Sequence, residues 1–215
     1  QTLIIGDIML DEYWFGDSNR ISPEAPIPVV NIKNKDFRLG GAGNVALNFS
    51  EINSNVTLVS TIGKDLDGKV IEKILKKKKI KSHLKKINIG KSIKKLRIFS
   101  SHYQMIRLDF ESEKKNYELK LDKKLKNEID KSKLILLSDY GKGTLIEVKK
   151  IIKYAKVKSK LIIIDPKGSD FDKYRHASIL TPNLSEFIEV VGEVNNKTQL
   201  IKKARDHIQK NNLIG

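Results

Sequence analysis

Short apolar runs that alternate with amphipathic stretches are the feature that most constrains the fold of this 215-residue chain. Apolar runs typical of buried strands, each followed by Gly, Asp, Pro or Asn, occupy 3–9, 56–62, 134–138, 161–164 and 179–180. Helical patterns lie between and after them, at about 42–52, 66–78, 123–131, 145–158, 185–191 and 198–210. This alternation predicts an α/β fold with a mostly parallel sheet, whose functional residues lie at the carboxyl ends of the strands.

Two segments interrupt the alternation. Residues 12–32 contain Tyr13-Trp14-Phe15 and three prolines, and residues 93–110 form a long β-like stretch with interspersed polar residues. Both are typical of strands in a small separate sheet. We therefore expect one α/β domain over 1–215, with segments at about 12–35 and 93–110 inserted as a second sheet.

The charge of the chain is strongly positive, with 42 Lys and Arg against 26 Asp and Glu and a net charge of +16. Only six of the 42 are Arg, although proteins that recognise nucleic acids favour the Arg guanidinium, which binds phosphates and base edges through two hydrogen bonds. The lysines are also spread over most of the predicted helices. This pattern favours a solvated lysine-rich surface over a nucleic-acid partner. A nucleic-acid binder remains the alternative, and it would show a steep salt dependence of binding.

Two absences narrow the function further. The chain has no cysteine, which excludes disulfides, thiolate zinc sites and a thiol nucleophile, and which fits a cytoplasmic protein. No apolar run approaches the roughly 18 residues of a spanning helix, so no membrane association is indicated.

A glycine-rich loop, Gly40-Gly41-Ala42-Gly43-Asn44, precedes the helical pattern that starts near Val45. Backbone amides at such a helix start can bind phosphates or sugar hydroxyls. The loop also matches a loose dinucleotide fingerprint, which would make the protein an NAD-linked Rossmann enzyme. That match is weak, because residues 33–39 separate the loop from the strand expected at 29–32. A turn that only packs the helix closely is a further alternative.

Acids and lysines gather where the expected strands end. Asp7 and Asp11 follow the first strand, and the loops 138–143 and 165–168 each carry an Asp and a Lys, Lys142 and Lys167 among them. Such carboxylates can bind a polyol and such lysines an anion, although Asp, Pro and Gly also mark ordinary turns.

The segment Asn183-Leu184-Ser185-Glu186 places an amide and a carboxylate three residues apart at a helix start. Both could reach a hydrated Mg²⁺ ion. The same spacing is also that of a capping box, which needs no metal.

Together these motifs resemble ribokinase-like sugar kinases of the phosphofructokinase-B type. The longer stretches 6–16, 20–30, 104–111 and 138–143 resemble its branch of D-glycero-β-D-manno-heptose 7-phosphate kinases, which form the N-terminal half of bifunctional ADP-heptose synthesis proteins. The likeness extends from Leu3 to about Val191. It implies a three-layer α/β/α domain with a small β-sheet lid that often pairs between subunits.

The resemblance also implies an activity. ATP would phosphorylate the anomeric hydroxyl of the heptose 7-phosphate, giving the 1,7-bisphosphate used for the lipopolysaccharide core. Residues implied in sugar or sugar-phosphate binding are Asp7, Asp11, Gly40, Gly41, Asn44, Gln104, Arg107, Lys142 and Lys167. Those implied in ATP binding are Asn183, Leu184, Ser185 and Glu186, with Asn183 and Glu186 acting on Mg²⁺ through water.

One departure from the family pattern matters for activity. The Gly-Ala-Gly-Asp motif, whose Asp is the expected catalytic base, is absent from these 215 residues. We expect it beyond Gly215, in a domain of which this chain is the first part, and we expect no turnover from the chain alone. Another sugar kinase of the family and a non-catalytic sugar-phosphate-binding remnant are the remaining alternatives.

Overall fold

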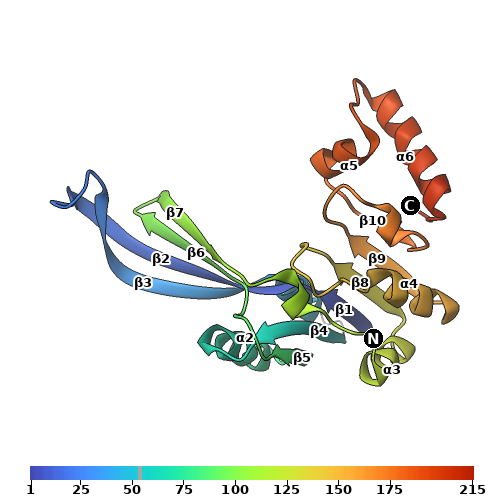
Figure 1. The fold of residues 1–215 in the computed structure, drawn as a ribbon, viewed down its shortest axis with the longest axis horizontal. Helices are drawn as coiled ribbons and strands as arrows, with labels where there is room; N and C mark the ends of the chain where they lie inside the picture. Colours follow the sequence, from blue (N-terminus) through green and yellow to red (C-terminus); the bar gives the residue numbers. More distant parts are fainter. Residues whose placement is uncertain (53–54) are drawn as a thin grey trace.

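The main body of the protein is a six-stranded parallel sheet with the strand order β10-β9-β8-β1-β4-β5 (Figure 1). The computed structural model describes residues 1–52 and 55–215. The strands are β1 (Thr2–Gly6), β4 (Val56–Gly63), β5 (Lys81–Ile87), β8 (Leu134–Ser138), β9 (Leu161–Asp165) and β10 (Ile179–Leu180). The parallel α/β sheet that the sequence predicts is therefore confirmed.

Helices cover both faces of this sheet because its central strand is apolar on both sides. Ile4 packs in the core under α1 (Ala42–Glu51) and α2 (Leu66–Lys77), whereas Leu3 and Ile5 pack in the core under α3 (Lys123–Lys131) and α4 (Val148–Val157). All three side chains are fully buried. The remaining helical elements are η1 (Lys114–Tyr117), η2 (Asp172–Tyr174), α5 (Leu184–Val191) and α6 (Lys197–Asn211).

A second sheet of four strands has the order β3-β2-β6-β7. It consists of β2 (Ile8–Ile21), β3 (Pro28–Gly41), β6 (Lys94–Ser100) and β7 (Tyr103–Phe110). Figure 1 shows β2 and β3 extending as a long ribbon away from the main body, with β6 and β7 beside them. The small second sheet is thus present, and we refer to it as the lid.

The first expected strand, residues 3–9, is divided between the two sheets, so the expectation of a single strand was wrong. β1 ends at Gly6, and from Ile8 onward the chain pairs with β3 and β6 of the lid. At the change of sheet, the Asp7 N–H donates to the Ser138 carbonyl at 3.2 Å, and the Asp7 carbonyl accepts from Ala42 N at 2.9 Å. The apolar residues on both sides of Gly6 and Asp7 indicate burial, but they do not reveal such a change of partner strand.

Strand β5 was missing from the sequence-based expectations. Its sequence, KSHLKKI, carries three lysines because it is the edge strand of the main sheet and much of it faces solvent. Helix α4 also begins later than expected, at Val148 rather than 145, because a turn precedes it in which Ile146 N donates to the Gly143 carbonyl at 3.3 Å.

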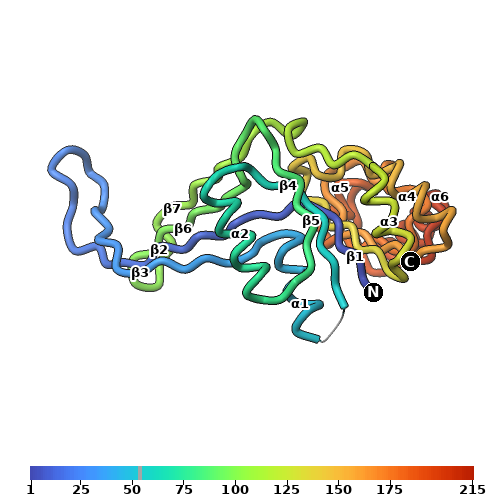
Figure 2. The backbone as a smooth tube through the Cα atoms, turned by 90° about the horizontal axis from the view of Figure 1, so that it is seen from below, coloured from blue at the N-terminus to red at the C-terminus, as the bar shows by residue number. Residues whose placement is uncertain are grey.

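The glycine-rich loop is the direct end of a strand, so the expected separation between loop and strand was wrong. β3 runs to Gly41 and α1 starts at Ala42, with Gly41 at φ 57° and ψ −135°. The tube in Figure 2 passes from the lid strand β3 to α1 beside the main body. A Cβ atom on Gly41 would lie 2.2 Å from the Asp7 carbonyl oxygen. The loop therefore needs glycine for both its conformation and its close packing against Asp7.

No helix in residues 1–52 and 55–215 combines the length and the apolar character needed to span a membrane.

We predict that Gly41→Ala lowers the free energy of unfolding by about 2 kcal/mol or more, because it combines backbone strain with overlap on the Asp7 carbonyl. Gly168→Ala is the matched control, since Gly168 also has a positive φ of 85° but no atom within 4 Å of an added Cβ. We expect a loss of about 1 kcal/mol for the control. Urea denaturation measures both, and equal losses would contradict the role of the Asp7 contact.

Candidate active site

The carboxyl ends of three neighbouring strands bring the expected acids to one edge of the main sheet. Gly6 of β1 pairs with Ser138 of β8, and Ser138 pairs with Asp165 of β9. The loops that follow these strands therefore start side by side. This is the edge at which parallel α/β sheets bind their ligands.

Asp7 is fully buried at this edge, and its carboxylate is turned toward the loop after β8. Its Oδ2 accepts from the backbone N–H groups of Tyr140 and Lys142 at 2.9 and 3.0 Å, and its Oδ1 accepts from Thr144 N at 2.9 Å.

Asp11 lies on β2, directly against the glycine-rich loop. A Cβ on Gly40 would come within 2.3 Å of Asp11 Oδ2, so only glycine leaves room for the carboxylate. Asn44 is exposed in the first turn of α1, which starts at the same loop. The structure thus places Asp11 against Gly40, with Gly41 and Asn44 following closely along the chain; we call these four residues the sugar cluster, after the ligand that the resemblance implies.

Arg97 is a residue of this region that the sequence analysis missed. Its Nη1 donates to Asp11 Oδ1 at 2.6 Å from the neighbouring strand β6. Burial alone would lower the pKa of the Arg97 guanidinium, but the hydrogen bond and charge of Asp11 outweigh it and raise the pKa. The β-like pattern of residues 93–110 could have pointed to Arg97. Two strands formed from this segment would bring Arg97 and Arg107 opposite each other, as they are on β6 and β7.

Gln104 and Arg107 lie on the lid strand β7, where every residue is exposed. Arg107 forms two contacts with Asp109, from Nε at 2.9 Å and from Nη2 at 3.0 Å. Since directly opposite residues of neighbouring strands project from the same face of a sheet, Arg107 lies on the lid face that also carries Arg97.

Lys142 and Tyr140 come from the loop after β8. The Lys142 ammonium pairs with Glu111. Tyr140, which the sequence analysis did not select, is half-buried and packs against a small apolar cluster that includes Met9 and Tyr117. Burial raises the pKa of the Tyr140 hydroxyl, and the charges of Asp165, Asp11 and Glu186 raise it further. Tyr140 therefore lies within the electrostatic influence of acids from both β2 and the α5 region.

Lys167 and the start of α5 form a second cluster, which we call the α5 cluster and which also contains Asp165, Asn183 and Glu186. Lys167 Nζ donates to Glu186 Oε1 at 2.8 Å. Asn183 Oδ1 accepts from Glu186 N at 2.9 Å and Glu186 Oε2 accepts from Asn183 N at 3.1 Å, so the capping box is present. Leu184 and Ser185 are exposed on the first turn of the same helix.

Asp165 is the acid of the α5 cluster that the sequence analysis noted but did not assign to the site. Burial raises the pKa of its carboxyl and the Glu186 carboxylate raises it further, although the Lys167 ammonium opposes them. Two carboxylates that repel each other are a suitable environment for a cation. Within the described residues, no group of three or more His, Asp or Glu side chains converges on one point that could hold a metal directly.

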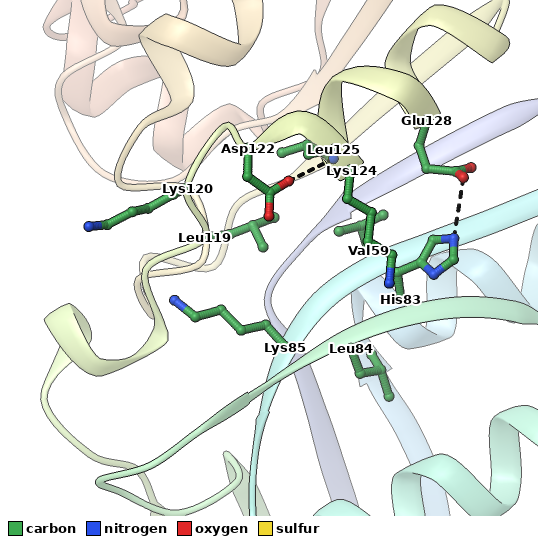
Figure 3. A pocket seen from close by; sticks show the side chains of 10 residues that line it. All are labelled: Val59, His83, Leu84, Lys85, Leu119, Lys120, Asp122, Lys124, Leu125 and Glu128. Carbon is green, nitrogen blue, oxygen red and sulfur yellow. Dashed lines mark hydrogen bonds and ion pairs between the residues drawn. The ribbon is translucent and has the colours of Figure 1, made fainter.

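A separate hollow of about 310 Å³ lies between the edge strand β5 and helix α3 (Figure 3). Its buried acid, Glu128, contacts His83 Nε2 at 3.3 Å and Lys81 Nζ at 3.3 Å. Burial would raise the pKa of Glu128, but the hydrogen bond and charge of Lys81 and then those of His83 outweigh it and lower the pKa. Because Lys81 neutralises it, Glu128 stabilises the packing of α3 on the sheet, and we assign this hollow no part in the candidate site.

The glycine-rich loop does not lie in the structural context that a dinucleotide-binding fingerprint requires. The glycine-rich loop joins the lid strand β3, which is antiparallel to β2, to α1. A dinucleotide fingerprint instead joins the first strand of a parallel βαβ unit to its helix.

We predict that Glu186→Gln lowers the pKa of Asp165 by removing a repelling charge, and that Lys167→Met raises it. Because the pKa of Asp165 is raised in the folded state, its contribution to stability is present at acidic pH and is lost as the pH rises through the raised pKa. Carboxyl ¹³C NMR titration measures the shifts. Glu193→Gln removes an exposed acid further along the chain and should leave Asp165 unchanged, and an equal shift in that control would contradict the assignment.

The model of the pfkB family of carbohydrate kinases matches residues 2–214. The chain is 47% identical over 204 residues to the bifunctional protein HldE of Haemophilus influenzae strain PittEE, covering 94% of this chain and 43% of that protein. It is 44% identical over the same length to HldE of Pasteurella multocida, with the same coverage. The chain thus spans less than half the length of these relatives.

Solved structures show the same fold at low sequence identity. Arabidopsis thaliana ribokinase, solved with ribose and ATP, has a TM-score of 0.77 at 16% identity, covering 99% of this chain and 69% of that one. Escherichia coli phosphofructokinase-2 with fructose-6-phosphate has a TM-score of 0.75 at 15% identity, covering 99% of this chain and 71% of that one. With a family match over almost the whole chain and relatives above 40% identity, this chain belongs to the pfkB family of carbohydrate kinases.

Proposed function

We propose that the protein acts in the ATP-dependent phosphorylation of D-glycero-β-D-manno-heptose 7-phosphate at its anomeric hydroxyl, for ADP-heptose and lipopolysaccharide core synthesis. The observation that carries the proposal is the placement of the Asp11 carboxylate against Gly40, beside the start of α1. A carboxylate at the edge where parallel α/β sheets bind their ligands suits a polyol, because it accepts hydrogen bonds from sugar hydroxyls, and Gly40 leaves the space that this carboxylate occupies. The heptose motifs and the identity to HldE proteins support this choice of sugar.

The sugar phosphate needs cations, and the lid supplies them. Arg97 and Arg107 lie on one face of the lid, and Lys142 lies on the loop below. Each is held by a carboxylate, from Asp11, Asp109 and Glu111 respectively. We infer that the substrate phosphate competes with these carboxylates for the three cations. Gln104 on the lid and Asp7 at the edge of the main sheet are the further residues that the resemblance implies near the sugar phosphate. The Arg107–Asp109 pair is the most exposed of the three, and exposed ion pairs contribute little net stability, so an arriving phosphate can replace Asp109 at small cost.

ATP is proposed to lie along the start of α5, at Asn183, Leu184, Ser185 and Glu186, with Lys167 beside it. The two carboxylates of the α5 cluster, Asp165 and Glu186, fit a hydrated Mg²⁺, since Lys167 pairs with Glu186 and leaves the carboxylate of Asp165 without a cation of its own in that cluster. Mg²⁺ would neutralise charge on the phosphates of ATP. The protein's own part is to position the two substrates and exclude water, which suits a cytoplasmic enzyme that draws on the ATP pool.

We predict that Asp11→Asn weakens binding of the heptose 7-phosphate at least about tenfold, because a carboxamide has one acceptor oxygen where the carboxylate has two. Asp17→Asn is the matched control on the same strand, since Asp17 pairs only with Lys33 at an exposed position. Isothermal titration calorimetry measures both affinities.

We expect binding but no phosphoryl transfer from the 215 residues, since they contain no Gly-Ala-Gly-Asp sequence. Turnover by this chain, followed by ³¹P NMR, would overturn the assignment of the base to that motif. Absence of heptose phosphate binding by the unmodified chain would overturn the proposed substrate.

The lid is also the proposed site of homodimer formation. Ile106 and Leu108 of β7 project from one face and are 48% and 38% exposed, and each lies opposite an apolar residue of β6, Ile98 and Leu96 respectively. An apolar sheet face that projects from the main body favours burial against a second copy.

We predict that Leu108→Lys shifts the protein from dimer to monomer, because the charge would be buried in the paired lids. Ile89→Lys, at a side chain that is 77% exposed outside the lid, is the control and should leave the dimer intact. Sedimentation velocity distinguishes the two states, and a monomeric wild-type protein would contradict the proposed dimer.

A further inference from the structure

The carboxylate of Asp7 makes an unusual set of contacts for a buried acid. It is 0% exposed, and both oxygens accept hydrogen bonds from the loop after β8, from Tyr140 N, Lys142 N and Thr144 N. Within the described part of the chain, no Lys, Arg or His forms an ion pair with it. The charge of Asp7 is therefore balanced by backbone amides alone.

The loop can make these contacts because its glycines occupy left-handed conformations at alternate positions. Gly141 has φ 67° and Gly143 has φ 120°, so the N–H groups of the residues on either side turn toward Asp7. A Cβ on Gly143 would lie 2.0 Å from the Lys114 carbonyl oxygen, which leaves no space for a larger residue. Successive inward amides form a concave anion site, and here a side chain of the protein itself fills it.

Only a carboxylate satisfies this arrangement. All three partners are donors, and an ionised carboxylate is the side chain that offers acceptors on both branches. An amide in its place would direct its own NH₂ group toward at least one backbone N–H, and burial would make that unpaired donor costly.

Asp7 also joins the loop to the sugar cluster. The Asp7 carbonyl accepts from Ala42 N at 2.9 Å, at the first residue of α1. The loop that its side chain holds carries Tyr140, which is half-buried and whose hydroxyl pKa is raised by burial and then by the charges of Asp165 and Asp11. The loop also carries Lys142, which pairs with Glu111 at the end of the lid.

We propose that Asp7 is a positioning residue, which holds the 139–144 loop so that Tyr140 and Lys142 stand between the sugar cluster and the α5 cluster. Both oxygens of Asp7 are occupied and the side chain is inaccessible, so Asp7 acts through the loop and makes no contact with the sugar. The relevance of this role to catalysis rests on the proposed kinase function. The holding of the loop rests only on the hydrogen bonds of the Asp7 carboxylate.

The test is Asp7→Asn, with two readouts. Amide hydrogen exchange should show residues 140, 142 and 144 protected in the wild-type chain and at least tenfold less protected in the variant, while the amides of β1 stay protected. Heptose 7-phosphate should bind about tenfold more weakly. ATP should bind within twofold of wild type, because the contacts that join the loop to the α5 cluster come from Asp139, whose amide donates to the Asp165 carbonyl and not to the Asp7 carboxylate. A merely destabilising substitution would weaken both ligands and expose β1 amides as well.

Asp122→Asn is the matched control, because Asp122 caps α3 through Leu125 N away from the site and asparagine caps equally well. It should change neither exchange in the loop nor either affinity. Unprotected loop amides in the wild-type chain, or unchanged protection in Asp7→Asn, would overturn the role of Asp7.

If Asp7→Asn does not fold, Tyr140→Phe with Lys142→Gln tests the same link, and unchanged heptose phosphate affinity in that variant would overturn it. If the wild-type chain binds no heptose 7-phosphate, the proposed function fails, and the holding of the loop is then decided by the exchange data alone.

Discussion

The change of sheet at Asp7 is the contact on which the rest of the site depends. The central strand of the main sheet ends at Gly6, where a Cβ atom would lie 2.1 Å from the Ser138 carbonyl, and the next residues already belong to the lid. Between the two, the Asp7 backbone binds β8 and the start of α1. The main sheet, the lid, the glycine-rich loop and the 139–144 loop therefore meet at one buried residue, Asp7.

In each of the two clusters of the candidate site, one acid forms an ion pair. Asp11 holds Arg97 at the lid, and Glu186 holds Lys167 at the start of α5. In both pairs an acid and a cation that could each bind substrate instead bind one another. The Lys167 side chain is 51% exposed and can be reached by a ligand without a large rearrangement, whereas Arg97 and Asp11 are only 20% and 17% exposed and hold each other in place. The proposed phosphoryl transfer needs mainly positioning and charge neutralisation from the protein.

Much of the fold could be predicted from the sequence because most core strands are apolar on both faces. The runs at 134–138 and 161–164 coincide closely with β8 and β9, since strands buried on both faces are apolar throughout. Strand β5 was missed for the opposite reason, because an edge strand rich in lysine lacks that signature. The second half of the first apolar run was assigned to the wrong sheet, because apolar character reports burial and not the identity of the partner strand.

The sequence by itself determined the parallel α/β architecture, the second sheet, the glycine-rich loop and the resemblance to sugar kinases, because each depends on residues close together in the chain. Only the tertiary structure decided which charges meet. The partners of Asp7 lie 133 to 137 residues away, and Arg97 lies 86 residues from Asp11. Contacts over such separations arise from how strands order themselves within two sheets, and local periodicity carries no information about that order. For the same reason, the sequence could not show that the Asp7 carboxylate accepts hydrogen bonds from the 139–144 loop.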